Sequence, residues 1–259
     1  MLPKDRIFAA LDLASPSVAL DFAARITADV GGVKVGSQLF TAGGPAFVRD
    51  LVSTGVRVFL DLKYHDIPNT VAPACIEAAR LGVFMLNLHC MGGRAMMQAA
   101  REGVAELNRQ AASTGQPRPL VLGVTLLTSL DYPALAELFP FLNPDLPGEE
   151  QDRFMRSEVV HLGELAQKAG LDGVVASPQE ARSLRETCGE DFVIVTPGIN
   201  LGGGPVADQK RTGTAGQAVR DGADYVVVGR AFLQAKNPNA VAQQMADEIF
   251  GAMAERKEA

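Results

Sequence analysis

The sequence predicts an α/β fold, a single (β/α)8 barrel of the TIM type that spans residues 1–259. Short runs rich in Val, Ile and Leu alternate with Ala-rich stretches of helical spacing along almost the whole chain, and eight such runs can be counted. Strict alternation of apolar strands and helices is typical of a parallel sheet covered by helices. A chain of 259 residues is close to the ~250 residues of one such barrel.

The expected elements follow from these patterns in chain order. We expect strands at 7–13, 32–36, 56–62, 84–89, 120–126, 173–176, 192–196 and 225–228, with the clearest helices at 17–30, 69–81, 96–108 and 178–187. Proline-rich residues 131–150 follow the fifth strand and indicate an elaborated loop of the barrel rather than a linker. An open doubly wound sheet is the alternative, but no G-x-G-x-x-G motif follows the first strand.

Composition and charge narrow the class of ligand. The chain is 47% hydrophobic and 21% charged, which excludes a disordered or collagen-like protein. Its net charge is −6 and it has no Lys/Arg-rich run, so we expect no nucleic-acid partner. An anionic ligand must therefore be bound by a local positive pocket.

Cysteine usage and the lack of long apolar runs indicate a cytoplasmic protein. Cys75, Cys90 and Cys188 are widely spaced and form no C-x-x-C pair, which favours neither a disulfide framework nor a zinc site. No apolar run approaches the ~18 residues of a membrane span, and the N-terminus lacks a signal-peptide pattern. We expect no membrane partner.

Charged residues occur at the ends of the first three expected strands, where barrels carry their active sites. Asp12 ends the first strand, Lys34 lies in the second, and Asp61 and Lys63 end the third, with Asp66 in the following loop. Strand residues two apart share a face, so Asp61 and Lys63 point the same way. Separate surface ion pairs are the alternative, but an alternating array lets charges coexist in a partly desolvated site.

This array favours chemistry at a carboxylate. A lysine between carboxylates is held protonated, which suits a proton donor to carbon rather than a Schiff-base nucleophile. Two like charges ~4 Å apart repel by about 4 kcal/mol at an effective dielectric constant near 20. A substrate carboxylate forced beside Asp61 is relieved of that repulsion when it leaves as neutral CO₂.

The loops after the last two strands have the features of a phosphate site. The seventh strand runs into Pro197-Gly198 and the glycine run 202–204, and the eighth ends in Gly229-Arg230. Barrels often bind phosphate here with backbone N–H groups, and a guanidinium can bind two phosphate oxygens at once.

The string D-L-K-Y-H-D-I-P-N-T at 61–70 resembles the D-x-K-x-x-D-I-P-N-T signature of the orotidine 5′-phosphate decarboxylase family. The resemblance runs from about residue 7 to 238, is weakest at 131–158, and includes the following strings in the family's order: A-L-D-L, V-K-V-G, T-L-L-T-S, V-T-P-G-I, A-D-Q-K-R and V-V-V-G-R. It implies decarboxylation of orotidine 5′-phosphate to UMP without a cofactor or metal.

The resemblance also implies a role for each matching residue. Lys63 protonates C6 of the pyrimidine, Asp61 lies against the substrate carboxylate, and Lys34 and Asp12 bind the ribose. Thr128 lies near the pyrimidine and Ile67 contacts the substrate. Gln209 bridges phosphate and pyrimidine, and Gly229 and Arg230 bind the phosphate. Asp66 and Thr70 reach into the partner's site, which implies a homodimer.

Asn200 departs from the family pattern, because many members carry arginine after T-P-G-I. We therefore leave Asn200 out of the expected site. His65 favours a loop or interface role, whereas for His89 an orienting role and a core role stay open.

Two other readings of the sequence remain. A related phosphosugar enzyme, such as a 3-keto-gulonate-phosphate decarboxylase or a hexulose-phosphate synthase, would use Mg²⁺. Those enzymes carry an acidic metal ligand at the position in the second strand that Lys34 occupies in this sequence. A non-catalytic nucleotide- or phosphosugar-binding barrel would be expected to lack Lys63 or one of its flanking aspartates, and all are present.

Overall fold

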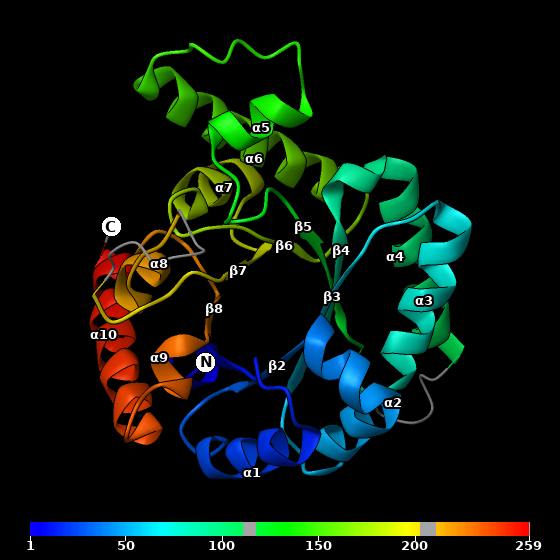
Figure 1. The fold of residues 1–259 in the computed structure, drawn as a ribbon, viewed down its shortest axis with the longest axis vertical. Helices are drawn as coiled ribbons and strands as arrows, with labels where there is room; N and C mark the ends of the chain where they lie inside the picture. The colour runs from blue at the N-terminus through cyan, green and yellow to red at the C-terminus, as the bar shows by residue number, and fades with distance from the viewer. Residues whose placement is uncertain (111–117, 203–210, 259) are drawn as a thin grey trace.

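The computed structural model describes residues 1–110, 118–202 and 211–258. Eight parallel strands close into a barrel in chain order, each paired with the next and the last with the first (Figure 1). The predicted (β/α)8 barrel is therefore confirmed. The strands are β1 (Ile7–Ala10), β2 (Gly32–Gly36), β3 (Val58–Tyr64), β4 (Met85–His89), β5 (Leu120–Val124), β6 (Gly173–Val175), β7 (Val193–Thr196) and β8 (Tyr225–Val228). The expected strand ends differ from these by up to three residues.

Helices surround the barrel, and short 3-10 turns occur at Pro3–Arg6 and Cys90–Gly92. The helices are α1 (Pro16–Ile26), α2 (Ser37–Ser53), α3 (Pro68–Arg80), α4 (Gly93–Gln110), α5 (Tyr132–Leu138), α6 (Gly148–Lys168), α7 (Ala181–Cys188), α8 (Ala215–Arg220), α9 (Arg230–Leu233) and α10 (Pro238–Glu258). Local sequence fixes several starts: Ser15 and Thr214 accept hydrogen bonds from the first turns of α1 and α8, as N-caps do. None of the helices in the described ranges has the length and apolar character needed to span a bilayer.

Two apolar cores hold the fold together. The larger one lies between the sheet and the helices, and a second fills the barrel interior. Inside the barrel, Phe8 packs against Phe84 and Tyr225, and the Arg57 guanidinium lies 4.8 Å from the centroid of the Phe84 ring. The interior is therefore a solid plug, which leaves space for a ligand only at its end.

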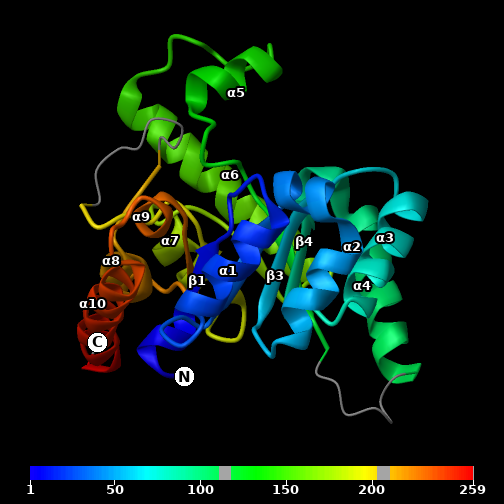
Figure 2. The same cartoon turned by 60° about the horizontal axis from the view of Figure 1, so that its bottom comes forward.

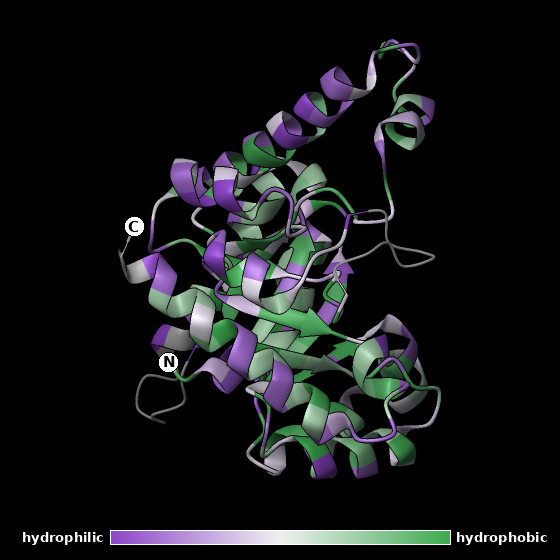
Figure 3. Ribbon diagram, turned by 90° about the vertical axis from the view of Figure 1, so that its left-hand side faces the viewer, coloured by the Kyte–Doolittle hydropathy of each residue, from purple (hydrophilic) through white to green (hydrophobic). Residues whose placement is uncertain are grey.

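The segment between β5 and α6 is more than a loop. Residues 132–138 form α5, and α6 begins at Gly148. Figures 2 and 3 show α5 and the first turns of α6 standing out from the body of the barrel. Leu138 and Phe141 on this projection are 60% and 83% exposed.

A buried arginine ties together the loops that follow three neighbouring strands. Arg211 donates from Nη1 to Glu180 Oε1 at 2.6 Å, and from Nη2 to the carbonyl oxygens of Leu126 and Leu127 at 3.0 Å each. Glu180 also accepts a short hydrogen bond from Ser177. Because the side chains of Arg211 and Glu180 are only 8% and 2% exposed, this ion pair fixes the loops after β5, β6 and β7 against one another.

We expect Glu180→Ala to lower the free energy of unfolding by about 3–5 kcal/mol, because it leaves the Arg211 guanidinium buried without its counter-charge. Urea unfolding followed by circular dichroism measures this. The matched control is Glu164→Ala, which removes an exposed pair with Lys168 on α6 and should change stability by no more than about 0.5 kcal/mol. Equal losses in the two variants would contradict a structural role for the buried pair.

Candidate active site

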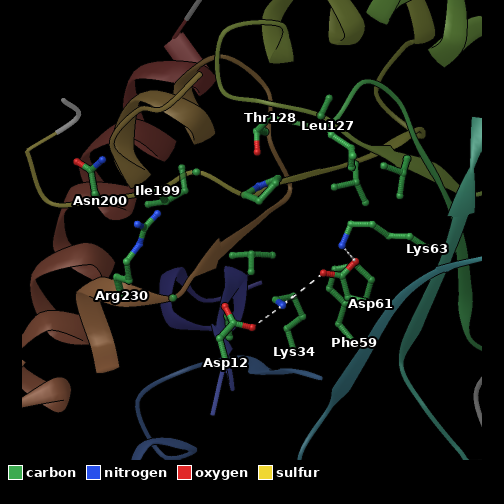
Figure 4. A pocket seen from close by; sticks show the side chains of 18 of the residues that line it. Asp12, Lys34, Phe59, Asp61, Lys63, Leu127, Thr128, Ile199, Asn200 and Arg230 are labelled. Atoms are coloured by element: carbon green, nitrogen blue, oxygen red, sulfur yellow. Dashed lines mark hydrogen bonds and ion pairs between the residues drawn. The ribbon is translucent and has the colours of Figure 1, made fainter. Parts of the chain in front are cut away.

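A pocket opens at the carboxyl ends of the strands, on top of the interior plug (Figure 4). Its floor consists of apolar side chains that belong to the plug, among them Ala10, Phe59, Val124, Val175 and Val227. Its polar lining includes seven residues that the sequence singles out: Asp12, Lys34, Asp61, Lys63, Thr128, Gly229 and Arg230. The structure therefore brings most of the expected site residues together in one cavity.

The four charged side chains from the first three strands form a continuous row of ion pairs. Lys34 Nζ lies 3.0 Å from Asp12 Oδ1 and 3.4 Å from Asp61 Oδ2. Lys63 Nζ lies 2.7 Å from the other oxygen, Asp61 Oδ1. The backbone leaves room for this at Gly36, where a Cβ atom would lie 3.3 Å from Lys34 Nζ. Each lysine therefore has an aspartate beside it, and Asp61 is shared between the two lysines.

Mutual attraction keeps the buried residues of this row of ion pairs ionised. Burial alone would lower the pKa of Lys34, but the carboxylates of Asp61 and Asp12 outweigh it and raise the pKa above its usual value. Burial alone would raise the pKa of Asp61, but Lys34 and Lys63, with hydrogen bonds from Lys63 and Asn87, bring that pKa below its usual value. Both groups therefore carry their charges at neutral pH.

Lys63 has an unusual backbone conformation. Its φ of 53° makes it the one non-glycine residue with positive φ in the described ranges, a conformation that costs roughly 1–2 kcal/mol for an L-residue. It lies where the register between β3 and β4 shifts. The Lys63 N–H donates to Asn87 Oδ1 at 2.8 Å, and Asn87 Nδ2 donates to Asp61 Oδ1 at 2.7 Å. Asn87 is not among the site residues expected from the sequence, since a lone asparagine in an apolar strand belongs to no charge pattern.

The opposite side of the pocket is suited to an anion. Figure 4 shows Arg230 and Asn200 on the side away from Asp61 and Lys63. The chain turns here at Gly198, whose φ of 83° favours glycine. Asn200, which is not among the expected site residues, lines the pocket, and its Oδ1 accepts from the N–H of Gly202 at 3.1 Å. The pocket thus has a guanidinium at one end and the row of lysine–aspartate ion pairs at the other.

Some expected residues lie apart from the pocket. Asp66 and Ile67, on the segment between β3 and α3, and Thr70, in the first turn of α3, are exposed and do not line the cavity of their own chain. Asp66 Oδ1 accepts from the N–H of Ile67 at 2.6 Å. Gln209 lies outside the described residues.

His65 and His89 form a pair beside the site, with ring centroids 5.3 Å apart. His65 is exposed and His89 is half-buried. Burial, followed by the nearby His65 and Lys63, lowers the pKa of His89. Neither ring lines the pocket. Cys90, directly after β4, is fully buried, and burial raises the pKa of its thiol to about 12, which does not suit a nucleophile.

These residues are poorly suited to bind a metal ion. In the parts of the chain that the structure describes, no group of three or more His, Cys, Asp or Glu side chains is arranged to hold a metal ion. The carboxylates of Asp12 and Asp61 are instead paired with the ammonium group of Lys34, which would repel a cation.

Known proteins with similar sequences share one activity in their names. The orotidine 5′-phosphate decarboxylase of Moorella thermoacetica is 46% identical over 250 residues, which cover 96% of this chain and 94% of the relative. That of Hydrogenovibrio crunogenus is 45% identical over 243 residues, covering 94% and 95% of the two chains.

Solved structures agree with these relatives. The crystal structure of orotidine 5′-phosphate decarboxylase from Lactobacillus acidophilus superposes with a TM-score of 0.77 at 33% identity, covering 93% of this chain and 97% of that one. The enzyme from Pyrococcus horikoshii OT3 gives a TM-score of 0.69 at 26% identity, covering 94% and 98%. Residues 5–245 match the family described as Orotidine 5′-phosphate decarboxylase / HUMPS family. With that match over nearly its whole length, this chain belongs to the Orotidine 5′-phosphate decarboxylase / HUMPS family.

Proposed function

We propose that this protein decarboxylates orotidine 5′-phosphate to UMP, the last step of UMP synthesis, without a cofactor or metal. The observation that carries the proposal is the placement of Lys63 and Asp61 in direct contact at one end of the pocket, with Arg230 at the other. An elongated ligand with a phosphate at one end and a carboxylate at the other matches that distribution of charge.

The chemistry follows from the contact between Asp61 and Lys63. The substrate carboxylate, on C6 of the pyrimidine, lies beside the Asp61 carboxylate and is repelled by it. The bond between C6 and the carboxylate carbon breaks, CO₂ leaves, and the bonding electron pair stays on C6. Lys63 Nζ then donates a proton to C6, which gives UMP, and solvent returns a proton to the lysine.

The remaining pocket residues bind the rest of the nucleotide. Lys34 and Asp12 hold the ribose hydroxyls, and Thr128 contacts the pyrimidine. Gly229 and Arg230 bind the phosphate, where a glycine lets the ligand approach the backbone and the guanidinium donates two parallel hydrogen bonds. Gln209 is assigned to the bridge between phosphate and pyrimidine.

The working unit is proposed to be a homodimer with shared sites. Asp66, Ile67 and Thr70 are exposed and lie outside the pocket of their own chain, although they belong to the same signature as Asp61 and Lys63. Ile67 is 65% exposed and Met91, after β4, is 43% exposed. Two-fold packing of this surface would cover these apolar side chains and carry Asp66 and Thr70 to the partner's substrate.

The cysteines, the net charge and the charged pocket residues bear on the cellular compartment, the partners and the alternative reaction. Three free, buried thiols (Cys75, Cys90 and Cys188) fit the reducing cytoplasm. No nucleic-acid partner is proposed, since the chain has a net charge of −6. The Mg²⁺-dependent phosphosugar reading gains no support from a pocket whose carboxylates are paired with Lys34.

The direct test is a spectrophotometric assay with orotidine 5′-phosphate in the presence of EDTA. We expect the pyrimidine absorbance to change as CO₂ is lost, at a rate that EDTA leaves unchanged, because Lys63 and Asp61 supply the reacting groups. Activity that disappears with EDTA and returns with Mg²⁺ would instead favour the phosphosugar reading.

Replacing the proposed acid should separate turnover from binding. We expect Lys63→Ala to lower kcat by about 10³-fold or more, since general acid catalysis contributes ~10²–10⁴-fold, while UMP binding by calorimetry stays measurable. The control is Lys168→Ala, which removes an ammonium group from the exposed end of α6 and should leave kcat unchanged. Turnover near the wild-type rate in Lys63→Ala would overturn the mechanism.

Mixing inactive chains tests whether the sites are shared. In a mixture of Lys63→Ala and Asp66→Ala chains, each heterodimer has one intact site, so random exchange restores about one quarter of wild-type activity. Mixing Lys63→Ala with Asp61→Ala is the matched control, because both residues belong to one subunit's site and no intact site can form. Recovery absent from the first mixture, despite subunit exchange verified by mass spectrometry, would contradict a shared site.

A further inference from the structure

An asparagine beneath the charged residues stands opposite the most irregular part of the sheet. The β3–β4 ladder pairs Leu60 with Leu86 and next pairs Tyr64 with Leu88. Three residues of β3, 61–63, therefore face one residue of β4, Asn87. Such a bulge leaves backbone groups without their ladder partners and re-aims the side chains it carries.

The Asn87 side chain takes the place of the missing ladder bond. Its Oδ1 accepts from the Lys63 N–H at 2.8 Å, and its Nδ2 donates to Asp61 Oδ1 at 2.7 Å. Asp61 Oδ1 is also the oxygen that Lys63 Nζ contacts at 2.7 Å. One amide thus holds the backbone of the lysine and the carboxylate that orients its ammonium group.

The side-chain amide of asparagine meets two demands in this space. The Lys63 N–H needs an acceptor and the Asp61 carboxylate needs a donor, and a planar amide presents one of each side by side. A leucine of similar shape offers neither, and an aspartate offers only acceptors when ionised. Because Asn87 is fully buried, water cannot replace either bond.

We propose that Asn87 is a positioning residue for the decarboxylation: it holds Lys63 in its left-handed backbone conformation and fixes the Asp61 carboxylate between the two lysines. Asn87 does not line the pocket and so acts through these two residues rather than on the substrate. The inference rests on the proposed function and adds to it a residue from β4, a strand with no part in the charge pattern.

The first arm of the test removes both hydrogen bonds while keeping the shape. We expect Asn87→Leu to lower kcat by about 100-fold, the cost of a catalytic group displaced by ~1 Å. The affinity for UMP should change by less than about threefold, because uniform binding is not lost. The matched control is Met85→Leu, on the same face of β4 but deeper in the plug, and it should leave kcat unchanged.

The second arm uses Asn87→Asp, in which the introduced carboxyl lies beside Asp61. Burial and the like charge raise the pKa of such a group, so it is protonated at low pH and ionised at high pH. Protonated, it donates to Asp61 and accepts from the Lys63 N–H as the amide does; ionised, it repels Asp61. We expect the ratio of variant to wild-type kcat to rise at least about tenfold as the pH falls from 8 to 5. Using the ratio cancels the pH dependence that both enzymes share.

The outcomes separate the inference from the proposed function. Wild-type chain that fails to decarboxylate orotidine 5′-phosphate refutes the function itself. Active wild type together with Asn87→Leu kcat within about threefold of it, or a kcat ratio for Asn87→Asp that does not vary with pH, overturns the positioning role. If Asn87→Leu fails to fold by circular dichroism, the pH profile of Asn87→Asp decides alone.

Discussion

Asp61 has two ammonium neighbours, Lys34 at 3.4 Å and Lys63 at 2.7 Å, and the site depends on that shared carboxylate. A carboxylate with a side chain only 10% exposed would by itself be strongly destabilising, because desolvation of an unpaired charge costs several kcal/mol. Pairing with Lys34 alone would leave Lys63 free to move, and pairing with Lys63 alone would leave Lys34 attached to the more exposed Asp12. The shared arrangement places every member opposite a charge of the other sign, so all four have to be present together.

The same coupling determines how the site responds to pH. The pKa of Asp61 is lowered on folding, so its contribution to stability is present above its unfolded pKa and is lost as the pH falls through the folded value. The pKa of Lys34 is raised on folding, so its contribution is present below its unfolded pKa and is lost as the pH rises through the folded value. Between these limits the pair keeps its charges. The Lys34–Asp61 pair therefore does not act as a switch across the neutral range.

The sequence predicts the barrel and most of the pocket well, for physical reasons that can be named. Apolar strands repeat with helices between them, and charges at strand ends must meet because parallel strands end at one rim. Features that depend on side chains meeting across the fold are not predictable in this way. Neither the bulge at residues 61–63 nor the role of Asn87 leaves a periodic signal. Likewise, Arg211 shows its function only when Glu180 and the Leu126 carbonyl are seen around it. Helix α5 differs from the expected loop because prolines are frequent in the segment that contains it and conceal a short helical turn. The one proline of the helix, Pro133, lies at its start, where proline is tolerated.

The distance between the two ends of the pocket matters as much as either end. In the proposed reaction, repulsion between Asp61 and the substrate carboxylate weakens binding of the ground state, and it accelerates the reaction only if the substrate is held in place against it. Binding at the other end, around Arg230, can supply that force because it does not change as the carboxylate departs. The rigid plug beneath Ala10 and Phe59 prevents the ligand from sinking away from the charges. The proposed mechanism therefore needs recognition at one end and repulsion at the other, and both act together only on a ligand that spans the pocket.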